Sequence, residues 1–371
     1  MSALEPLQQI GRCRVRWRGR DLLYFSGCDY FRLAEHPVVL KAVGAGVKNF
    51  GLNVAASRLT TGHHKIYELL EEQLAGFFGA GDALLVSTGY LTGIIVAQAL
   101  AGNFSHALLD ERAHPALLDA ANYLGCPILK FKHRDAGDFA RTIGRCGKGT
   151  RPMVLTDGMF SHNGSVAPLK AYLKLLPRDG MILVDDAHGG GVLGKNGCGT
   201  PDYENVGRGQ IIQCITLSKA FGVYGGVILG TPDLRDRIIN HSRAFIGSTP
   251  LPLPLANAAL ASLKIYRSRG AGLRARLNKN AQYVKSALGR AKFEIPAMPG
   301  PIIPIHAKTE RESLALKKHL LAAGILPPFL KYPGGDANGY FRFVISSEHN
   351  RTDLNCLINA FRNFNDFQNA H

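Results

Sequence analysis

The stretch of residues 211–222 constrains the fold most strongly, because it has the pattern of a buried strand that ends in a lysine. It opens with the run Ile-Ile-Gln-Cys-Ile, and such apolar, β-branched runs are typical of strands covered on both faces. Thr216, Ser218 and Lys219 follow, and a glycine-rich turn comes next. An ammonium group is costly to remove from water, so Lys219 either emerges into a solvated loop or serves as a desolvated amine that attacks a carbonyl.

A second short apolar run has the same organisation. Residues 181–184, Met-Ile-Leu-Val, are followed by Asp-Asp-Ala-His, which begins at Asp185, and then by three glycines. Ligands of open α/β sheets bind outside the carboxyl ends of the strands, so we expect Asp185 and Lys219 at one edge of one sheet. This pair suits pyridoxal 5'-phosphate (PLP), because a lysine can hold the aldehyde while an aspartate pairs with the pyridine nitrogen.

The two motifs resemble those of the α-oxoamine synthases, a family of fold-type I PLP enzymes. The family's Asp-(Asp/Glu)-Ala-His-Gly and Thr-Leu-(Ser/Gly)-Lys-Ala signatures occur here at 185–189 and 216–220, and the similarity extends from about Gly11 to Asn350. The resemblance implies an α/β fold with a large, mostly parallel sheet domain, helices on both of its faces and a smaller α+β C-terminal domain. We expect an N-terminal β-ribbon arm at 1–40, a PLP-binding domain at 41–265 and a small domain at 266–371.

The cofactor phosphate is expected where a strand at 82–87 leads through Thr88, Gly89 and Tyr90 into a helix at 94–100. A strand, a turn of small residues and a helix N-terminus form an anion site of backbone N–H groups, although an ordinary connection would have the same pattern. The resemblance assigns these three residues to the phosphate. It also implies that Ser248 and Thr249 reach the phosphate of the neighbouring subunit, which would make the protein a homodimer with shared active sites.

The resemblance assigns further residues to the cofactor ring. His114 follows a strand at 107–110 and would stack on the pyridine, although the two residues after it differ from the family's His-Ala-Ser. Ser161 would bond the phenolate oxygen or nearby substrate, and His188 would contact a cofactor oxygen. Thr216 and Ser218 complete the expected cofactor set, and the expected catalytic groups are Lys219, His114, Asp185 and His188.

Two residues are candidates for holding the amino-acid substrate. Arg342 lies on an apolar strand at 340–346, and the resemblance makes it the anchor for the α-carboxylate, a task that suits a bidentate guanidinium. A salt-bridged sheet arginine is the alternative. Residues 26–33 resemble the family's Ser-Asn-Asp-Tyr-Leu-Gly-Leu, but Cys28 replaces an asparagine that commonly helps to hold the carboxylate. A thiol is a weak hydrogen-bond donor, so we expect a non-standard substrate as one possibility.

Arginines alternate with other residues near the N-terminus, at positions 12, 14, 16, 18 and 20. Strict alternation places them on one face of a strand. They form either a solvated face of a hairpin, with residues 22–25 as the return strand, or a stripe that binds phosphates or an acidic carrier.

Charge and composition limit the partners. The chain has 44 basic and 28 acidic residues and a net charge of +16, which attracts anions. The basic residues are dispersed and no nucleic-acid motif accompanies them, so CoA or an acyl carrier protein is favoured over nucleic acid. No apolar run is long enough for a membrane span, and the N-terminal residues lack the basic-then-apolar pattern of a signal peptide. Seven scattered cysteines without metal-ligand spacing indicate reduced thiols, a cytoplasmic location and no metal site.

The expected reaction is a decarboxylative condensation of an amino acid with an acyl-CoA or acyl carrier protein thioester to an α-aminoketone. The best candidate is the 8-amino-7-oxononanoate synthase type, which uses L-alanine. Alternatives within the family are the 2-amino-3-ketobutyrate CoA ligase, serine palmitoyltransferase and signal-molecule synthase types. A PLP aminotransferase is a further alternative, whereas Lys219, Asp185 and His114 argue against a non-catalytic partner subunit.

Overall fold

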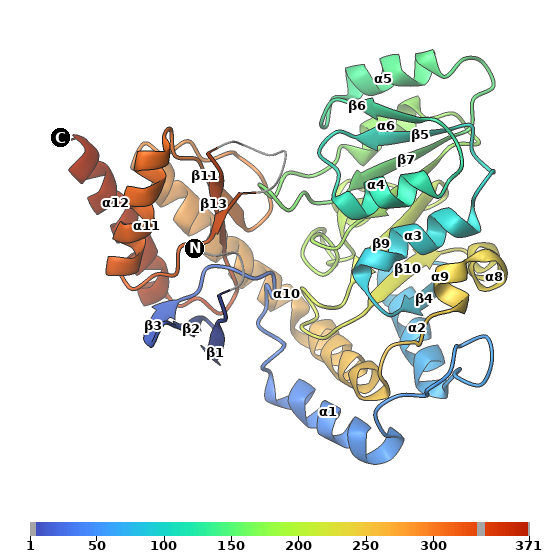
Figure 1. The fold of residues 1–371 in the computed structure, drawn as a ribbon, viewed down its shortest axis with the longest axis horizontal. Helices are drawn as coiled ribbons and strands as arrows, with labels where there is room; N and C mark the ends of the chain where they lie inside the picture. Colours follow the sequence, from blue (N-terminus) through green and yellow to red (C-terminus); the bar gives the residue numbers. More distant parts are fainter. Residues whose placement is uncertain (1–4, 332–337, 370–371) are drawn as a thin grey trace. The chain divides into compact units, whose positions relative to one another are not determined.

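The computed structural model describes residues 5–331 and 338–369 of the chain, which form two compact units (Figure 1). The larger unit comprises residues 36–161 and 165–271. The smaller unit combines the N-terminal residues up to Glu35, residues 162–164 and the chain from Gly272 onward. Helix α10 (Leu253–Arg290) contributes its first part to the larger unit and the rest to the smaller one.

The larger unit is built on a seven-stranded sheet with the order β4-β10-β9-β8-β7-β5-β6. Strand β10 runs antiparallel to both of its neighbours, and the other strands are parallel to one another. The strands are β4 (Asp82–Val86), β5 (His106–Asp110), β6 (Ile128–Phe131), β7 (Pro152–Asp157), β8 (Met181–Asp185), β9 (Ile211–Thr216) and β10 (Gly226–Gly230). The expected α/β class with a mostly parallel sheet is confirmed.

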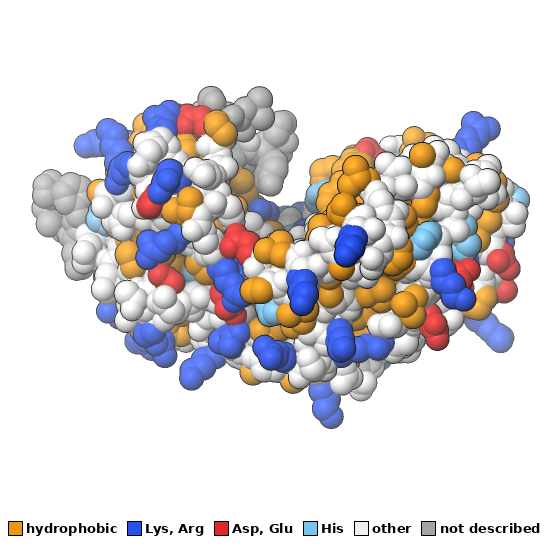
Figure 2. Space-filling model, turned by 90° about the horizontal axis from the view of Figure 1, so that it is seen from below, with side chains coloured by type: hydrophobic (Ala, Val, Ile, Leu, Met, Phe, Trp, Pro, Cys, Tyr) orange, Lys and Arg blue, Asp and Glu red, His pale blue; other side chains and the backbone are white. Residues whose placement is uncertain are grey.

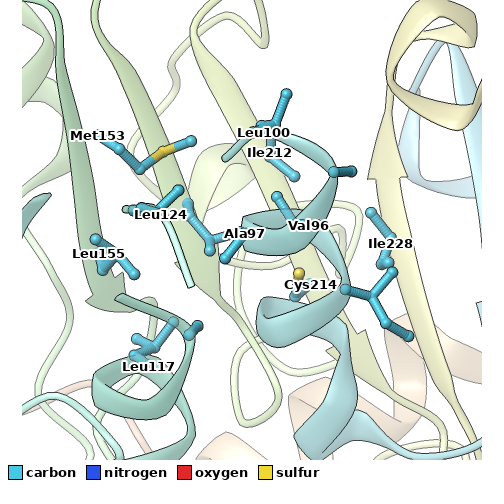
Figure 3. Close-up of a cluster of buried hydrophobic side chains, with 14 of the residues drawn as sticks. Val96, Ala97, Leu100, Leu117, Leu124, Met153, Leu155, Ile212, Cys214 and Ile228 are labelled. Atoms are coloured by element: carbon cyan, nitrogen blue, oxygen red, sulfur yellow. The ribbon is translucent and has the colours of Figure 1, made fainter. Parts of the chain in front are cut away.

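Helices cover both faces of this sheet, which explains why its strands are apolar without alternation. On one face, Met153 and Leu155 of β7 pack with Val96 and Leu117, as Figure 3 shows. On the other face, Val154 packs in a cluster with residues of α5 and α6. The helices of this unit are α1 (Pro37–Phe50), α2 (Lys65–Phe78), α3 (Gly89–Ala99), α4 (Pro115–Asn122), α5 (Ala136–Arg145), α6 (Leu169–Leu175), α7 (Thr200–Tyr203), α8 (Pro232–His241) and α9 (Arg243–Ile246).

Three elements differ from the sequence-based expectation. Helix α3 begins at Gly89 rather than near residue 94, because the Thr88 hydroxyl caps it by accepting a hydrogen bond from the Leu91 N–H at 3.4 Å. The glycines near residue 225 lead directly into strand β10, where only a turn was expected. Residues 255–267 and 273–288, whose apolar patterns predict two helices, form one continuous helix, α10.

The smaller unit has two three-stranded antiparallel sheets. One has the order β11-β13-β12 and packs with α11 (Glu310–Ala322) and α12 (Arg351–Asn369) around a shared apolar core. Its strands are β11 (Ile302–Ile305), β12 (Phe329–Leu330) and β13 (Tyr340–Val344). The other sheet is the N-terminal ribbon β1 (Gln8–Gly11), β2 (Arg14–Trp17) and β3 (Arg20–Leu23), whose first strand was not anticipated. Among the described residues, no helix combines the length and the apolar character needed to cross a membrane.

Candidate active site

Half of the predicted site residues lie at or just beyond the carboxyl ends of four neighbouring parallel strands. Strands β5, β7 and β8 end in Asp110, Asp157 and Asp185, and β9 leads through Thr216 to Lys219. Asp157 and Asp185 are register partners, which places their side chains next to each other on the same side of the sheet. The sheet topology therefore concentrates ionisable groups at one edge, as the sequence predicted.

Lys219 lies in a tight turn just past β9 and is half-buried. The turn is closed by hydrogen bonds from the Val223 N–H to the Leu217 carbonyl (2.9 Å) and from the Gly222 N–H to the Lys219 carbonyl (3.1 Å). The Thr216 hydroxyl donates to the Gly225 carbonyl at 3.1 Å and lies 2.6 Å from the hydroxyl of Ser218. Since the Thr216 proton is committed to Gly225, Ser218 is the donor of this pair.

His114, Asp185 and Lys219 are electrostatic neighbours. Burial lowers the pKa of His114, the Asp185 carboxylate acts to raise it, and the Lys219 ammonium lowers it further. His114 also caps α4, because its Nδ1 accepts a hydrogen bond from the Ala116 N–H at 3.2 Å. An acceptor at Nδ1 leaves the ring proton on Nε2, so the imidazole is held as one neutral tautomer.

The expected phosphate cradle adjoins β9. Gly89 lies so close to Thr216 that a Cβ at position 89 would be 2.8 Å from the Thr216 Cβ, so a larger residue would not fit. The N-terminus of α3 therefore lies next to Thr216, and its first N–H groups, apart from that of Leu91, which donates to Thr88, can face an anion. Tyr90 in the first turn of α3 donates its hydroxyl to Asp119, and its ring meets His114 edge-on with 6.2 Å between the ring centroids.

Ser248 and Thr249 follow α9 and line a small pocket in the larger unit together with Ser87, which directly precedes Thr88. Arg58 also lines this pocket, but its guanidinium pairs with the buried carboxylate of Glu71. The pocket is thus lined by hydroxyl groups, and the charge of Arg58, its one lining cation, is neutralised by Glu71.

The turn after β8 is built around Asp186, which sequence reasoning did not single out. Its carboxylate accepts hydrogen bonds from the Thr200 hydroxyl and N–H (2.6 and 2.7 Å) and from the Gln213 amide (2.6 Å). Burial raises the pKa of Asp186 to about 6, although these hydrogen bonds act to lower it. Gly158, Gly189 and Gly199 surround the carboxylate so closely that a Cβ on any of them would collide with it. This glycine cage shapes the turn that carries His188, which is itself buried.

Ser161 lies on a loop that begins at the end of β7. The Phe160 N–H donates to the Ser165 carbonyl at 2.8 Å and thereby closes the base of this loop. His133 supports it from β6, because its ring meets Phe160 edge-on and its Nδ1 lies 3.0 Å from the Asp110 carboxylate. Ser161 and His188 therefore follow adjacent strands at the same edge of the sheet.

Arg342 and Cys28 both belong to the smaller unit, and both act electrostatically on the buried Tyr30. Burial raises the pKa of Tyr30, Cys28 acts in the same direction, and Arg342 opposes it, so the phenol, thiol and guanidinium lie within electrostatic reach. The backbone of Arg342 is fixed on β13, where its N–H donates to the Pro328 carbonyl at 2.9 Å. The two residues assigned to substrate binding thus share one buried phenol as a neighbour.

The N-terminal arginines form an ion-paired, largely exposed face. Arg16 pairs with Asp21 at 2.7 Å, Arg18 with Glu5 at 2.6 Å, and Arg12 with Glu348 at 2.9 Å. Figure 2 shows lysine and arginine side chains scattered over the visible face rather than gathered in one patch. These acidic partners favour the interpretation of the arginine stripe as a solvated face.

Comparisons with known proteins identify the family of the chain. The family model for aminotransferase class I and II matches residues 21–361. The chain is 35% identical to the 8-amino-7-oxononanoate synthase of Hahella chejuensis over 355 residues, which are 95% of this chain and 89% of that protein. It is 33% identical to the enzyme of the same name from Thioalkalivibrio sulfidiphilus over 345 residues, 92% of this chain and 88% of that one.

Solved structures support the same fold. Serine palmitoyltransferase from Sphingomonas wittichii has a TM-score of 0.91 and 23% identity, covering 98% of this chain and 92% of that chain. The 8-amino-7-oxononanoate synthase of Francisella tularensis has a TM-score of 0.81 and 23% identity, covering 94% and 98%. The similarity to solved structures supports the fold, and the similarity to the curated relatives supports the family assignment. The chain belongs to the α-oxoamine synthase family of aminotransferase class I and II proteins.

Proposed function

We propose that this chain is a PLP-dependent enzyme that condenses an amino acid with an acyl thioester to an α-aminoketone. L-Alanine is the preferred amino acid, which the sequence resemblance implies, and the curated relatives are named 8-amino-7-oxononanoate synthase. The observation that carries the proposal is the convergence of Lys219, Asp185 and His114, which follow or end strands β9, β8 and β5 at one edge of the sheet and lie within electrostatic reach of one another.

The residues at this edge fit PLP. An amine is present for the aldehyde, a carboxylate for the pyridine nitrogen, and a glycine-lined helix N-terminus for the phosphate. Thr88 and Gly89 would bind the phosphate with the first N–H groups of α3, and Tyr90, Thr216 and Ser218 would border it. His114 would stack on the ring, which suits the neutral imidazole that its lowered pKa implies. Ser161 and His188 would donate hydrogen bonds to cofactor oxygens.

Side chains of this protein would bind the substrate and transfer its proton. Bound PLP supplies an electron sink for charge that develops at the α-carbon of the amino acid. Arg342 holds the α-carboxylate, and Cys28 borders that carboxylate without a strong hydrogen bond. Lys219 Nζ takes the α-proton as a general base. Asp185 keeps a negative charge beside the ring nitrogen, so that the nitrogen retains its proton.

A homodimer with shared sites is part of the proposal. Large apolar side chains are exposed along α1 and the segment after it, including Leu40 (54%), Leu52 (68%) and Leu59 (50%). Apolar side chains are also visible between the charged ones on the face that Figure 2 presents. Exposed apolar groups of this kind mark an interaction surface. Ser248 and Thr249 would then reach the phosphate of the neighbouring subunit. The seven cysteines are all thiols in the described part of the chain, which suits the reducing cytoplasm.

The test is a screen for thiol release. Purified protein is incubated with PLP, single amino acids and acyl-CoA or acyl carrier protein thioesters, and free thiol is measured. Release is expected with L-alanine and a medium-length acyl thioester, and it should be absent in the K219A variant. Borohydride treatment should fix the cofactor to Lys219, which peptide mapping would locate.

Other outcomes identify the alternatives. Release with glycine, serine or another amino acid would point to a different α-oxoamine synthase, which is the outcome that Cys28 makes worth testing. Transfer of the amino group to a 2-oxo acid without thiol release would replace the synthase assignment by an aminotransferase. Neither cofactor attachment nor thiol release with any pair would overturn the proposal entirely.

A further inference from the structure

Asp157 is a buried carboxyl at the candidate active site to which the proposed chemistry gives no role. It ends β7, is only 4% exposed, and is the register partner of Asp185 on β8. Its neighbour Gly158 donates its N–H to the Asp185 carbonyl at 2.7 Å, which ties the ends of the two strands together. Asp157 is therefore held at a fixed distance from the proposed partner of the pyridine nitrogen.

The side chain of Asp157 makes one contact that bears on the cofactor. Its Oδ2 accepts a hydrogen bond from the backbone N–H of His114 at 2.7 Å. The His114 ring is held separately by the Ala116 N–H. Asp157 thus fixes the backbone, and α4 fixes the imidazole, of the residue expected to stack on the ring.

The charges around Asp157 disfavour its ionised form. Asp185 faces it from β8, Asp110 lies beyond it at the end of β5, and Lys219 lies past β9. Among residues 5–331 and 338–369, Asp157 forms no ion pair. Two carboxyls on neighbouring strands avoid double ionisation when both are removed from water. Burial first, and Asp185 second, raise the pKa of Asp157 well above its usual range, while the His114 N–H and Lys219 act in the opposite direction.

We propose that Asp157 is a positioning residue that works as a neutral carboxyl: it fixes His114 and leaves Asp185 as the single negative charge facing the ring nitrogen. The part of this inference that concerns the cofactor rests on the proposed PLP site. The charge state of Asp157 concerns the protein without cofactor and can be measured independently.

The test compares D157N and D157L with the wild type and with D185N. Asn is isosteric with a protonated Asp and keeps an oxygen for the His114 N–H, whereas Leu fills the space without an acceptor. The first measurement is thermal unfolding of the cofactor-free protein between pH 5 and 8, and the second is the Kd of PLP, followed by quenching of protein fluorescence. Circular dichroism confirms that each variant folds.

The expected results differ between the variants. A carboxyl whose pKa is raised in the folded state costs stability as pH rises above its unfolded pKa, so D157N should gain Tm relative to the wild type as pH increases. D157N should bind PLP within about threefold of the wild type, and D157L roughly tenfold more weakly, the scale of one lost hydrogen bond. D185N should lose far more affinity than D157N, because it removes the charge that the ring nitrogen requires.

Two results would overturn the inference. One is a Tm difference between D157N and the wild type that stays constant or falls with rising pH, which would mean that Asp157 is ionised. The other is an unchanged Kd for PLP in folded D157L, which would mean that the hydrogen bond to His114 positions nothing. If wild-type protein does not bind PLP, the proposed function fails, while the unfolding data still decide the charge of Asp157.

Discussion

The Cα hydrogens of Gly89 face the side chain of Thr216, and a methyl group at position 89 would lie 2.8 Å from its Cβ. Thr216 cannot move aside freely, because its hydroxyl is bound to Ser218 and to the Gly225 carbonyl. This contact sets the spacing between the start of α3 and the end of β9, which are the two elements proposed to hold the cofactor phosphate and the aldehyde.

A G89A variant should therefore bind PLP more weakly. Overpacking at this contact is expected to cost about 1–3 kcal/mol of stability and to push the helix N-terminus away from the phosphate. G144A is the matched control, because Gly144 lies on α5 with open space around it and should gain up to about 1 kcal/mol from its better helix propensity. Equal PLP affinity in G89A and the control would contradict the assignment of this turn to the phosphate.

The pKa of His114 should respond in opposite directions to its two charged neighbours. Removing the ammonium in K219A should raise the pKa, and removing the carboxylate in D185N should lower it further. The titration can be followed by NMR of labelled imidazoles in the cofactor-free protein, with an H114Q variant to assign the signal among the 13 histidines. A pKa that is unchanged in both variants would show that the three groups are farther apart than described.

The buried carboxylate of Glu71 should be important for stability. It accepts hydrogen bonds from Arg58, from Arg235 (2.9 Å) and from the Leu85 N–H (2.7 Å). An E71Q variant leaves the buried Arg58 without its acid and leaves Arg235 with only Asp82, at 3.2 Å, so it should lose roughly 3 kcal/mol in denaturant unfolding. The exposed pair between Arg141 and Asp138 provides the comparison, since R141A should cost less than about 1 kcal/mol. Similar losses in the two variants would contradict the burial of the Glu71 cluster.

The smaller unit should be sensitive to acid through His349. This residue is buried, its Nδ1 accepts from the Ser346 N–H, and its Nε2 lies 3.1 Å from the Tyr24 carbonyl. Burial lowers the pKa of His349 from 6.5 to about 3, and Arg32 acts in the same direction. Its contribution to stability is therefore complete above pH 6.5 and is lost as the pH falls toward 3.

An H349N variant tests this contribution. In the wild type the unfolding free energy should fall by about 1.4 kcal/mol per pH unit from this group alone below pH 6.5. The variant should show a correspondingly shallower dependence on pH, whereas H241N, at an exposed position, should follow the wild type. Parallel pH profiles for all three proteins would show that His349 is charged in the folded state.

The sequence predicted the parts of the site that depend on local patterns. Strands β8 and β9 were clear because their apolar runs are short, β-branched and ended by polar groups, and the residues after them carry the family motifs. Strand β10 was missed because Gly225 and Gly226 indicate a turn, and the closeness of Gly226 to the Thr88 backbone becomes visible only in the folded sheet. Helix α3 was started too late because the capping role of Thr88 depends on one hydrogen bond.

Asp157 and Asp186 were missed for a different reason. Each is an ordinary acid in the sequence, and its significance comes from partners that are far away along the chain. Asp157 gains its role from register with Asp185, and Asp186 from Thr200 and Gln213. Pairing between strands is set by the whole sheet, so no local pattern could have identified these two residues.

The glycine cage around Asp186 also limits which substitutions this region can accept during evolution. Because the carboxylate fills the volume that side chains at 158, 189 and 199 would otherwise occupy, a longer acid at 186 has no room unless the surrounding backbone widens. These four positions should therefore be inherited as a unit. Relatives that carry Glu instead of Asp at this position are expected to differ in the path of the loop that leads to Thr200. A D186E substitution alone should therefore prevent folding of this chain, whereas exchange of the entire segment should preserve it.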